Sequence, residues 1–70
     1  MIENLRKAVE LAGGQTSLAR MINVSQPRLW NWINRDKIVP AEFVKPICDA
    51  VDNKVKPHEL RGDIFSDDAS

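Results

Sequence analysis

The sequence predicts an all-α fold of four to five short helices around one core, for three reasons. Apolar residues recur at spacings of three and four in successive segments, and glycine, proline or asparagine stands between those segments. The chain has 70 residues and one cysteine, so helix packing rather than a disulfide framework must stabilise it. We therefore expect a single domain over residues 1–65, followed by a frayed polar tail over residues 66–70.

The first helix is predicted over residues 2–12. Its apolar side chains are Ile2, Leu5, Val9 and Ala12. They fall on one face at helical spacing, and charged side chains fill the opposite face. Gly13 and Gly14 follow, and because glycine adopts the left-handed conformation without penalty, the helix should end there.

Two short helices, over residues 16–22 and 26–34, are predicted at the centre of the domain. Their apolar faces consist of Leu18, Ala19 and Ile22 in the first and Leu29, Trp32 and Ile33 in the second. Ala19 is small at the point where two helices must cross closely. The pattern predicts a helix-turn-helix, a motif that places its second helix in the major groove of DNA.

The boundaries of these two helices have their own signals. Thr16 is a candidate cap for the first helix, and Asn23 tolerates the left-handed backbone that ends it. Ser25 is a good N-cap for the second helix, and Pro27 lies in its first turn, where a missing N–H costs nothing.

A fourth helix is predicted over residues 40–52, beginning at Pro40. Its apolar residues are Phe43, Val44, Ile47, Ala50 and Val51. Pro46 lies inside it and removes one backbone hydrogen bond, so a kink or break is expected between residues 42 and 46. A short helical turn over residues 57–60 follows, and the side chains expected to close the core are Leu60, Ile64 and Phe65.

Charge is distributed unevenly, although the formal net charge is zero. Residues 13–38 carry four basic side chains against one acidic, whereas residues 39–70 carry four basic against seven acidic. The positive potential therefore lies on the predicted helix-turn-helix, where the phosphates of DNA would be met.

The outward face of the helix over residues 26–34 supplies the candidate base-reading residues, which are Gln26, Pro27, Arg28, Trp30, Asn31 and Asn34. Gln and Asn can form two hydrogen bonds with adenine, Arg can do the same with guanine, and a proline or Trp edge can contact a thymine methyl group. Trp30 has two interpretations: an exposed anchor for DNA or a partner, or a side chain that curls over the helix edge.

Candidate phosphate contacts flank this helix, and they are Gln15, Thr16, Ser17, Ser25, Arg35 and Lys37. Exposed amide groups at a helix start, beside a side-chain amide donor, suit a phosphate. The loop Arg35-Asp36-Lys37 presents two basic side chains; a merely solvated turn is the alternative interpretation.

The predicted helix-turn-helix has a regular spacing of Gln15, Ala19, Val24, Leu29 and Trp32. By this spacing it resembles the helix-turn-helix of phage Cro and cI-type repressors, with Asn23 where that family usually has glycine. The rest of the chain is similar to YdaS-type Cro-like proteins of lambdoid phages and prophages, through Val39-Pro40-Ala41-Glu42, Val55 and Glu59-Leu60-Arg61-Gly62-Asp63-Ile64-Phe65.

This resemblance implies a lambda-repressor-like fold and a small transcriptional regulator. Such a protein would bind double-stranded operator DNA, usually as two copies on an inverted repeat. Carried over by position, Gln15 would bond a phosphate, and the residues facing base edges would be Gln26, Pro27, Arg28 and Asn31. For dimerisation, a contact through Val55, Ile64 and Phe65 and a monomer that pairs only on DNA fit equally well.

Other functions are less well supported. His58 is the sole histidine and Cys48 the sole thiol, and they form no convincing nucleophile–base pair. Neither metal-ligand spacing nor a glycine-rich phosphate loop occurs, so we expect no catalysis, no cofactor, no metal and no small-molecule substrate. No apolar run approaches the roughly 20 residues that cross a bilayer, so we expect a cytoplasmic protein without a membrane partner.

A protein-interaction module is the second hypothesis. The chain would act like an antitoxin and neutralise a partner protein, with the acidic C-terminal part as its contact surface. This hypothesis does not exclude DNA binding.

Overall fold

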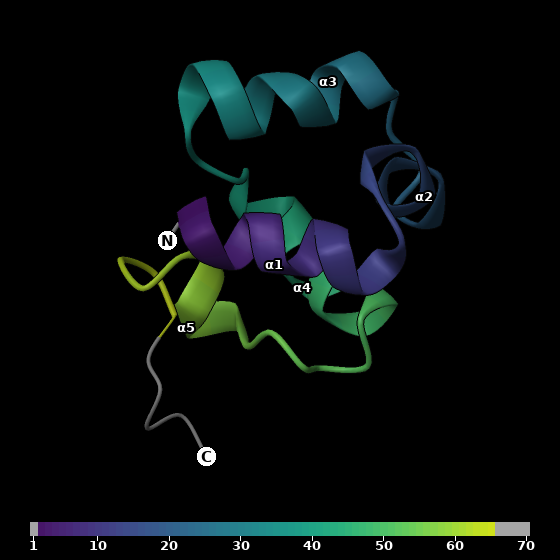
Figure 1. Cartoon of the computed structure of the whole chain (residues 1–70). Helices are drawn as coiled ribbons and strands as arrows, with labels where there is room; N and C mark the ends of the chain where they lie inside the picture. Colours follow the sequence, from purple (N-terminus) through teal and green to yellow (C-terminus); the bar gives the residue numbers. More distant parts are fainter. Residues whose placement is uncertain (1, 66–70) are drawn as a thin grey trace.

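The computed structural model describes residues 2–65, and within them every regular element is a helix (Figure 1). The elements are α1 (Ile2–Ala12), α2 (Gln15–Met21), α3 (Gln26–Asn31), the π-helical η1 (Trp32–Asp36), α4 (Ala41–Ala50) and α5 (Pro57–Leu60). The all-α prediction is confirmed. The frayed tail predicted over residues 66–70 lies outside the described residues.

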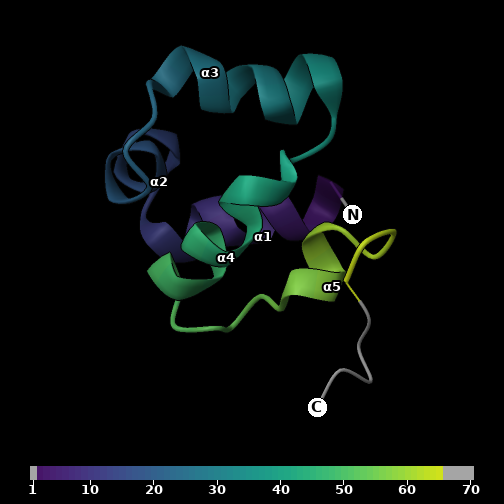
Figure 2. The same ribbon diagram turned by 180° about the vertical axis from the view of Figure 1, so that it is seen from behind.

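Helix α1 lies at the centre of the arrangement and contacts α2, α4, α5 and η1. Helix α3 and η1 form one continuous rod on one side of α1, with α2 at the end of that rod (Figure 1). Seen from behind, α4 lies across the other side of α1, and α5 sits beside the first turn of α1 (Figure 2). The rod of α3 and η1 therefore keeps one long side free of other elements.

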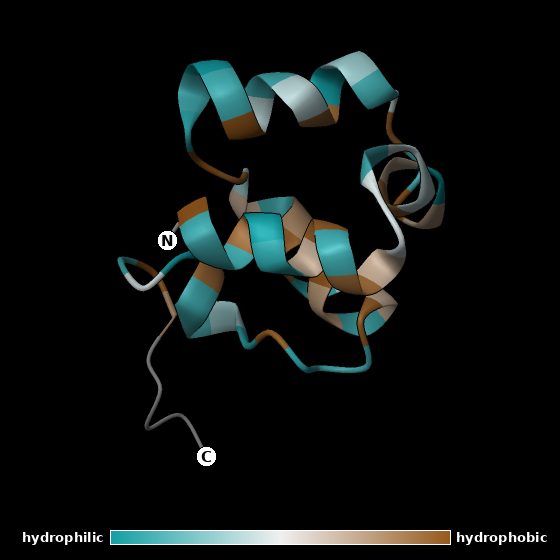
Figure 3. Ribbon diagram, viewed as in Figure 1, coloured by the Kyte–Doolittle hydropathy of each residue, from teal (hydrophilic) through white to brown (hydrophobic). Residues whose placement is uncertain are grey.

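The core lies between this rod and α1, α2 and α4. The predicted inward side chains Leu29, Trp32 and Ile33 are buried, and the brown segments of α3 and η1 face α1 (Figure 3). Ala8 and Val39 are also buried, although the periodicity did not single them out. Burial of one stripe of each helix leaves the polar stripe of α3 as its outer face.

The connection between α1 and α2 consists of Gly13 and Gly14, where the sequence predicts the end of the first helix. Gly13 and Gly14 have φ angles of 96° and 124°, a conformation that side chains other than glycine rarely adopt. The cap predicted at Thr16 is wrong, because α2 begins at Gln15 with Gly14 as its N-cap and without a capping side chain. Thr16 therefore lies inside the first turn.

The second helix of the motif starts as predicted but runs further. The Ser25 side chain accepts the backbone N–H of Arg28 at 3.3 Å, and Pro27 lies in the first turn. Beyond Asn31 the helix continues as η1 to Asp36, two residues past the predicted end. It ends at Lys37, which has a φ of 55°. The amide of Ile38 then donates to the carbonyl of Trp32 at 3.2 Å.

Helix α4 passes through Pro46 without interruption, so of the predicted kink or break the break is wrong, and the kink stays a prediction. The carbonyl that loses its partner belongs to Glu42, and both residues are exposed, so water can replace the missing bond. The helix ends at Ala50, two residues earlier than predicted, where Asp52 and Asn53 adopt left-handed conformations. The amide of Asn53 donates to the Cys48 carbonyl at 2.8 Å.

The predicted turn at residues 57–60 is present as α5, and two side chains connect it to the rest of the fold. Asn4 Nδ2 donates to the Glu59 carbonyl at 2.9 Å, and Arg61 Nη1 donates to the Val39 carbonyl at 2.7 Å. Leu60 is buried, as predicted, whereas Ile64 is 52% exposed.

Candidate nucleic-acid interface

A tight turn holds α2 and α3 in contact. Asn23 adopts a φ of 61°, which asparagine tolerates better than most residues, and the next amide, of Val24, donates to the Ala19 carbonyl at 2.9 Å. Ala19 itself is buried. The small residue and the left-handed turn together place α2 against α3, as a helix-turn-helix requires.

The six candidate base-reading residues lie on α3 and η1 outside the core. Pro27, Arg28, Trp30 and Asn34 are exposed, and Gln26 and Asn31 are half-buried. Trp30 retains 48% of its surface exposed, although tryptophan is a costly residue to leave in water. Each residue is accessible to a ligand, and its contact with a base stays a prediction.

The amides of Gln26 and Gln15 form a hydrogen bond between the two helices of the motif. Gln26 Nε2 donates to Gln15 Oε1 at 2.8 Å. The bond fixes which end of each amide remains available: Gln15 keeps its Nε2 donor, and Gln26 keeps its Oε1 acceptor and its second N–H. Because the pair is partly buried, it orients both side chains before any ligand arrives.

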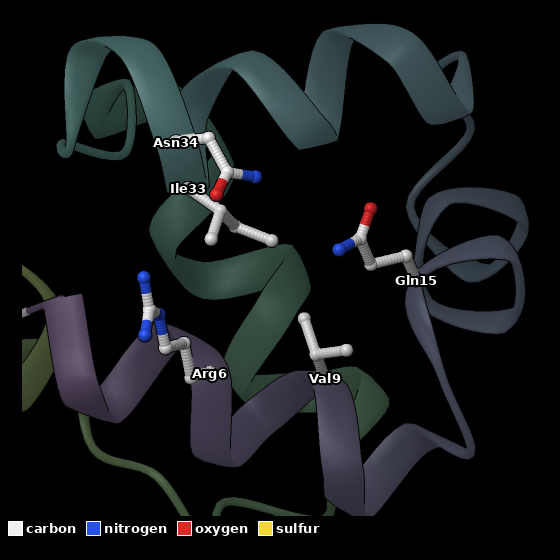
Figure 4. Close-up of a pocket in the computed structure, with 5 residues that line it drawn as sticks. All are labelled: Arg6, Val9, Gln15, Ile33 and Asn34. Carbon is white, nitrogen blue, oxygen red and sulfur yellow. The ribbon is translucent and has the colours of Figure 1, made fainter.

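A pocket of about 270 Å³ opens beside this pair. Its lining residues are Arg6, Val9, Gln15, Ile33 and Asn34. Figure 4 shows Arg6 and Val9 rising from α1, Ile33 and Asn34 facing them from η1, and Gln15 reaching in from the start of α2. The guanidinium of Arg6 and the Nε2 of Gln15 make this a pocket with hydrogen-bond donors, suited to an anionic oxygen.

Arg6 was not among the predicted site residues. On the sequence it belongs to the solvated face of the first helix, and only the crossing of α1 and η1 brings it to Gln15 and Asn34. Asn34 also donates from Nδ2 to the Trp30 carbonyl at 3.1 Å. This bond leaves its Oδ1 free and places the side chain at the pocket.

On the opposite flank of α3, two aromatic rings contact Arg28. Its guanidinium carbon lies 5.7 Å from the ring centroid of Trp32 and 5.2 Å from that of Phe43, which belongs to α4. The two rings are 5.0 Å apart between centroids. Phe43 was predicted only as an apolar helix residue, because a contact between residues of separate helices leaves no signal in local spacing.

The remaining candidate phosphate contacts have different surroundings. Thr16 is exposed, Ser17 is half-buried, and the Ser25 oxygen accepts the capping bond while its hydroxyl proton stays available. Arg35 Nε donates to Asp36 Oδ1 at 3.0 Å, which balances part of its charge locally. Lys37 is exposed in the turn that follows η1.

Cys48 is buried, and burial raises the pKa of its thiol above the usual value. A thiol with a raised pKa stays protonated and weakly nucleophilic at neutral pH. Residues 2–65 contain no group of three or more His, Cys, Asp and Glu side chains placed to hold a metal ion.

Two predictions about surfaces can be compared with the structure. None of the helices within residues 2–65 has the length and apolar character that a bilayer crossing requires. The predicted contribution of Val55 to a dimer contact is wrong, because Val55 has no exposed surface and belongs to the core of its own chain. Ile64 remains exposed and Phe65 half-buried.

Comparison with known proteins supports the resemblance found in the sequence. The family model described as "Bacterial toxin YdaS" matches residues 5–69. A protein of Escherichia coli (strain K12) named "Putative transcriptional regulator YdaS" is 36% identical over 61 residues, which are 87% of this chain and 62% of that protein. The chain thus spans less than two thirds of this relative, and no solved structure gives a significant match. On the family match and this identity, the chain belongs to the YdaS family.

Proposed function

We propose that this protein is a sequence-specific transcriptional regulator that reads double-stranded operator DNA with α3 in the major groove. The observation that carries the proposal is the hydrogen bond between Gln26 and Gln15, which orients two polar side chains on the outer surface of a helix-turn-helix. The name of the related protein as a transcriptional regulator supports the same function.

Base reading would come from the outer stripe of α3. Gln26 keeps an acceptor and a second donor beyond its bond to Gln15, and an adenine edge requires one of each. Asn31, five residues further along the helix, offers a second amide for the same kind of contact. Pro27 and the exposed ring of Trp30 are apolar surfaces for thymine methyl groups.

Phosphate contacts would hold α3 in place on both sides. On one side, Arg6 and the free Nε2 of Gln15 face the pocket, where a phosphate oxygen can accept from both. Asn34 lines the same pocket, but its Nδ2 donates to the Trp30 carbonyl and an amide oxygen cannot donate to a phosphate, so Asn34 remains a candidate for base reading alone. The remaining contacts would come from Thr16, Ser17 and Ser25 at the helix starts, from Arg35 in the last turn of η1 and from Lys37 directly after it.

Regulation would follow from occupancy alone, as in a Cro-type repressor. A bound protein excludes polymerase from the promoter, and no chemical step is needed. Two copies on an inverted repeat would place their α3 helices about 34 Å apart, one turn of DNA. The exposed Ile64 is our candidate for the contact between the copies.

The second candidate is an antitoxin-like module that neutralises a partner protein. The family description, a bacterial toxin, is compatible with a role outside transcription but names neither an antitoxin nor a partner. Co-purification with the product of an adjacent gene would support this second candidate.

The test is a selection of bound fragments from a random double-stranded DNA pool at about 150 mM salt. An enriched inverted repeat would support the regulator and give the half-site spacing. Asn31→Ala should then lose enrichment, whereas Lys54→Ala should keep it, because Lys54 lies in the segment between α4 and α5, away from α3 (Figure 1). Binding that simply fades with salt, without enrichment, would contradict sequence-specific recognition.

A further inference from the structure

We propose that Phe43, on α4, is a positioning residue for DNA recognition, because it holds the guanidinium of Arg28 against an aromatic platform. The proposal rests on the proposed function, in which α3 reads DNA. It adds to the interface a residue that lies outside the helix-turn-helix and has no predicted contact with DNA.

The platform consists of two rings from two elements. Phe43 and Trp32 lie 5.0 Å apart between ring centroids, with an angle of 43° between their planes. Arg28 is close to both, with its Cζ 5.2 Å from the Phe43 centroid and 5.7 Å from the Trp32 centroid. Both distances lie within the range of a cation–π contact. Trp32 is only 4% exposed, so the core fixes the platform.

The rings leave the hydrogen-bonding edge of Arg28 free. Among residues 2–65 its guanidinium takes part in no described hydrogen bond or ion pair, and the residue is exposed. A guanidinium presents its N–H donors as a planar fork, and contact with aromatic rings leaves that fork available. The fork matches a pair of acceptor atoms, which DNA supplies at a guanine edge or at a phosphate.

The two rings order the Arg28 side chain before DNA binds. An arginine side chain on a helix surface samples many rotamers, and ordering it on binding weakens affinity. The contacts with Trp32 and Phe43 restrict Arg28 before DNA arrives. Because Trp32 is part of the core, Phe43 is the member of the platform that can be changed with less effect on folding.

A double-mutant cycle tests the proposal. Phe43→Leu should weaken binding to the selected operator by roughly three- to tenfold in the wild-type background, about the cost of ordering one long side chain on binding. In the Arg28→Ala background it should have no further effect. Phe43→Tyr, which keeps the ring, should bind like the wild type. Equal losses in both backgrounds, or no loss at all, would overturn the proposal.

Folding and DNA binding are checked separately. In the free protein, ring currents should shift the Arg28 side-chain protons upfield in NMR spectra, and Phe43→Leu should reduce this shift. Absence of the shift in the wild type overturns the proposal, whereas a shift without DNA binding refutes only the proposed function. Should Phe43→Leu not fold, Phe43→Met replaces it in the same cycle, since methionine keeps a similar volume and is flexible but has no ring.

The same variants identify the DNA group that Arg28 contacts. If Arg28 reads guanine, Phe43→Leu should reduce the preference at one base pair of the operator. If Arg28 contacts a phosphate, Phe43→Leu should weaken binding equally for all sequences. Arg28→Ala should then reduce the magnitude of the slope of log Kobs against log salt concentration by about 0.9, the value for one phosphate contact. Either result supports positioning by Phe43 when the cycle shows coupling.

Discussion

Gln15 has two different roles at the two atoms of its amide. Its Oε1 accepts from Gln26 Nε2 at 2.8 Å, and its own Nε2 faces the pocket, where we expect a DNA phosphate. Gln15→Ala removes one phosphate contact, about 1 kcal/mol of binding. It also removes the bond that orders Gln26 in the free protein, so ordering Gln26 on binding costs roughly 1 kcal/mol more. The variant should therefore lose about 2 kcal/mol of operator binding, a roughly thirtyfold increase in Kd.

Gln15→Glu separates the two roles. A carboxylate can still accept from Gln26, but it repels a phosphate in the pocket. Gln15→Glu should therefore weaken binding to all sequences alike. Gln15→Ala should in addition reduce the preference at the base pair that Gln26 reads, because Gln26 loses the bond that orients it.

Fluorescence anisotropy titrations on the selected operator and its single base-pair variants measure both effects. Thermal unfolding of each variant checks that the fold is retained. Lys7→Ala is the matched control, since Lys7 is an exposed cation of α1 that does not line the pocket, and its Kd should change little. The reasoning is refuted if Gln15→Glu binds as tightly as the wild type, or if Gln15→Ala leaves every base preference unchanged.

Three further predictions concern the pocket, the core and pH. Arg6→Ala should reduce the magnitude of the slope of log Kobs against log salt concentration by about 0.9, the value for one phosphate contact. A slope equal to that of Lys7→Ala would mean that Arg6 contacts no phosphate. Ile47→Ala should lower the free energy of unfolding in urea by about 2–5 kcal/mol, because Ile47 is fully buried; a much smaller loss would contradict close packing there. Hydrogen bonds from Arg61 lower the pKa of Asp63. The ionised Asp63 therefore stabilises the folded state at pH values above its unfolded-state pKa, and this stability is lost as the pH falls through the folded-state pKa. In urea titrations, acid below about pH 4 should destabilise the wild type more than Asp63→Asn.

The helix-turn-helix could be predicted from the sequence because its signals lie within a few residues of one another. Leu29, Trp32 and Ile33 repeat at helical spacing and are buried, and Asn23 adopts the left-handed conformation that the turn requires. Ser25 likewise caps α3, as its position before a polar first turn predicts.

Predictions failed where tertiary contacts or solvent decide the outcome. Pro46 does not break α4, because the carbonyl it leaves unpaired is at the surface. Arg6 and Phe43 reach the candidate interface only in the folded chain, where α1 contacts η1 and the Phe43 side chain reaches Arg28 and Trp32. No local pattern reports either contact. Val55 was predicted to contribute to a dimer contact, yet the fold of its own chain encloses it completely.

The bonds made by Asn4 and Arg61 connect the part of the described chain that is synthesised last to residues that are synthesised earlier. Asn4 donates to the Glu59 carbonyl, Arg61 donates to the Val39 carbonyl, and Leu60 is buried beside them. Helices α1 to α4 therefore leave the ribosome before the residues that close their core. A reading frame stopped ahead of α5 should yield a polypeptide with its interior open to proteases, so a late nonsense mutation should give no product rather than a weakly active one.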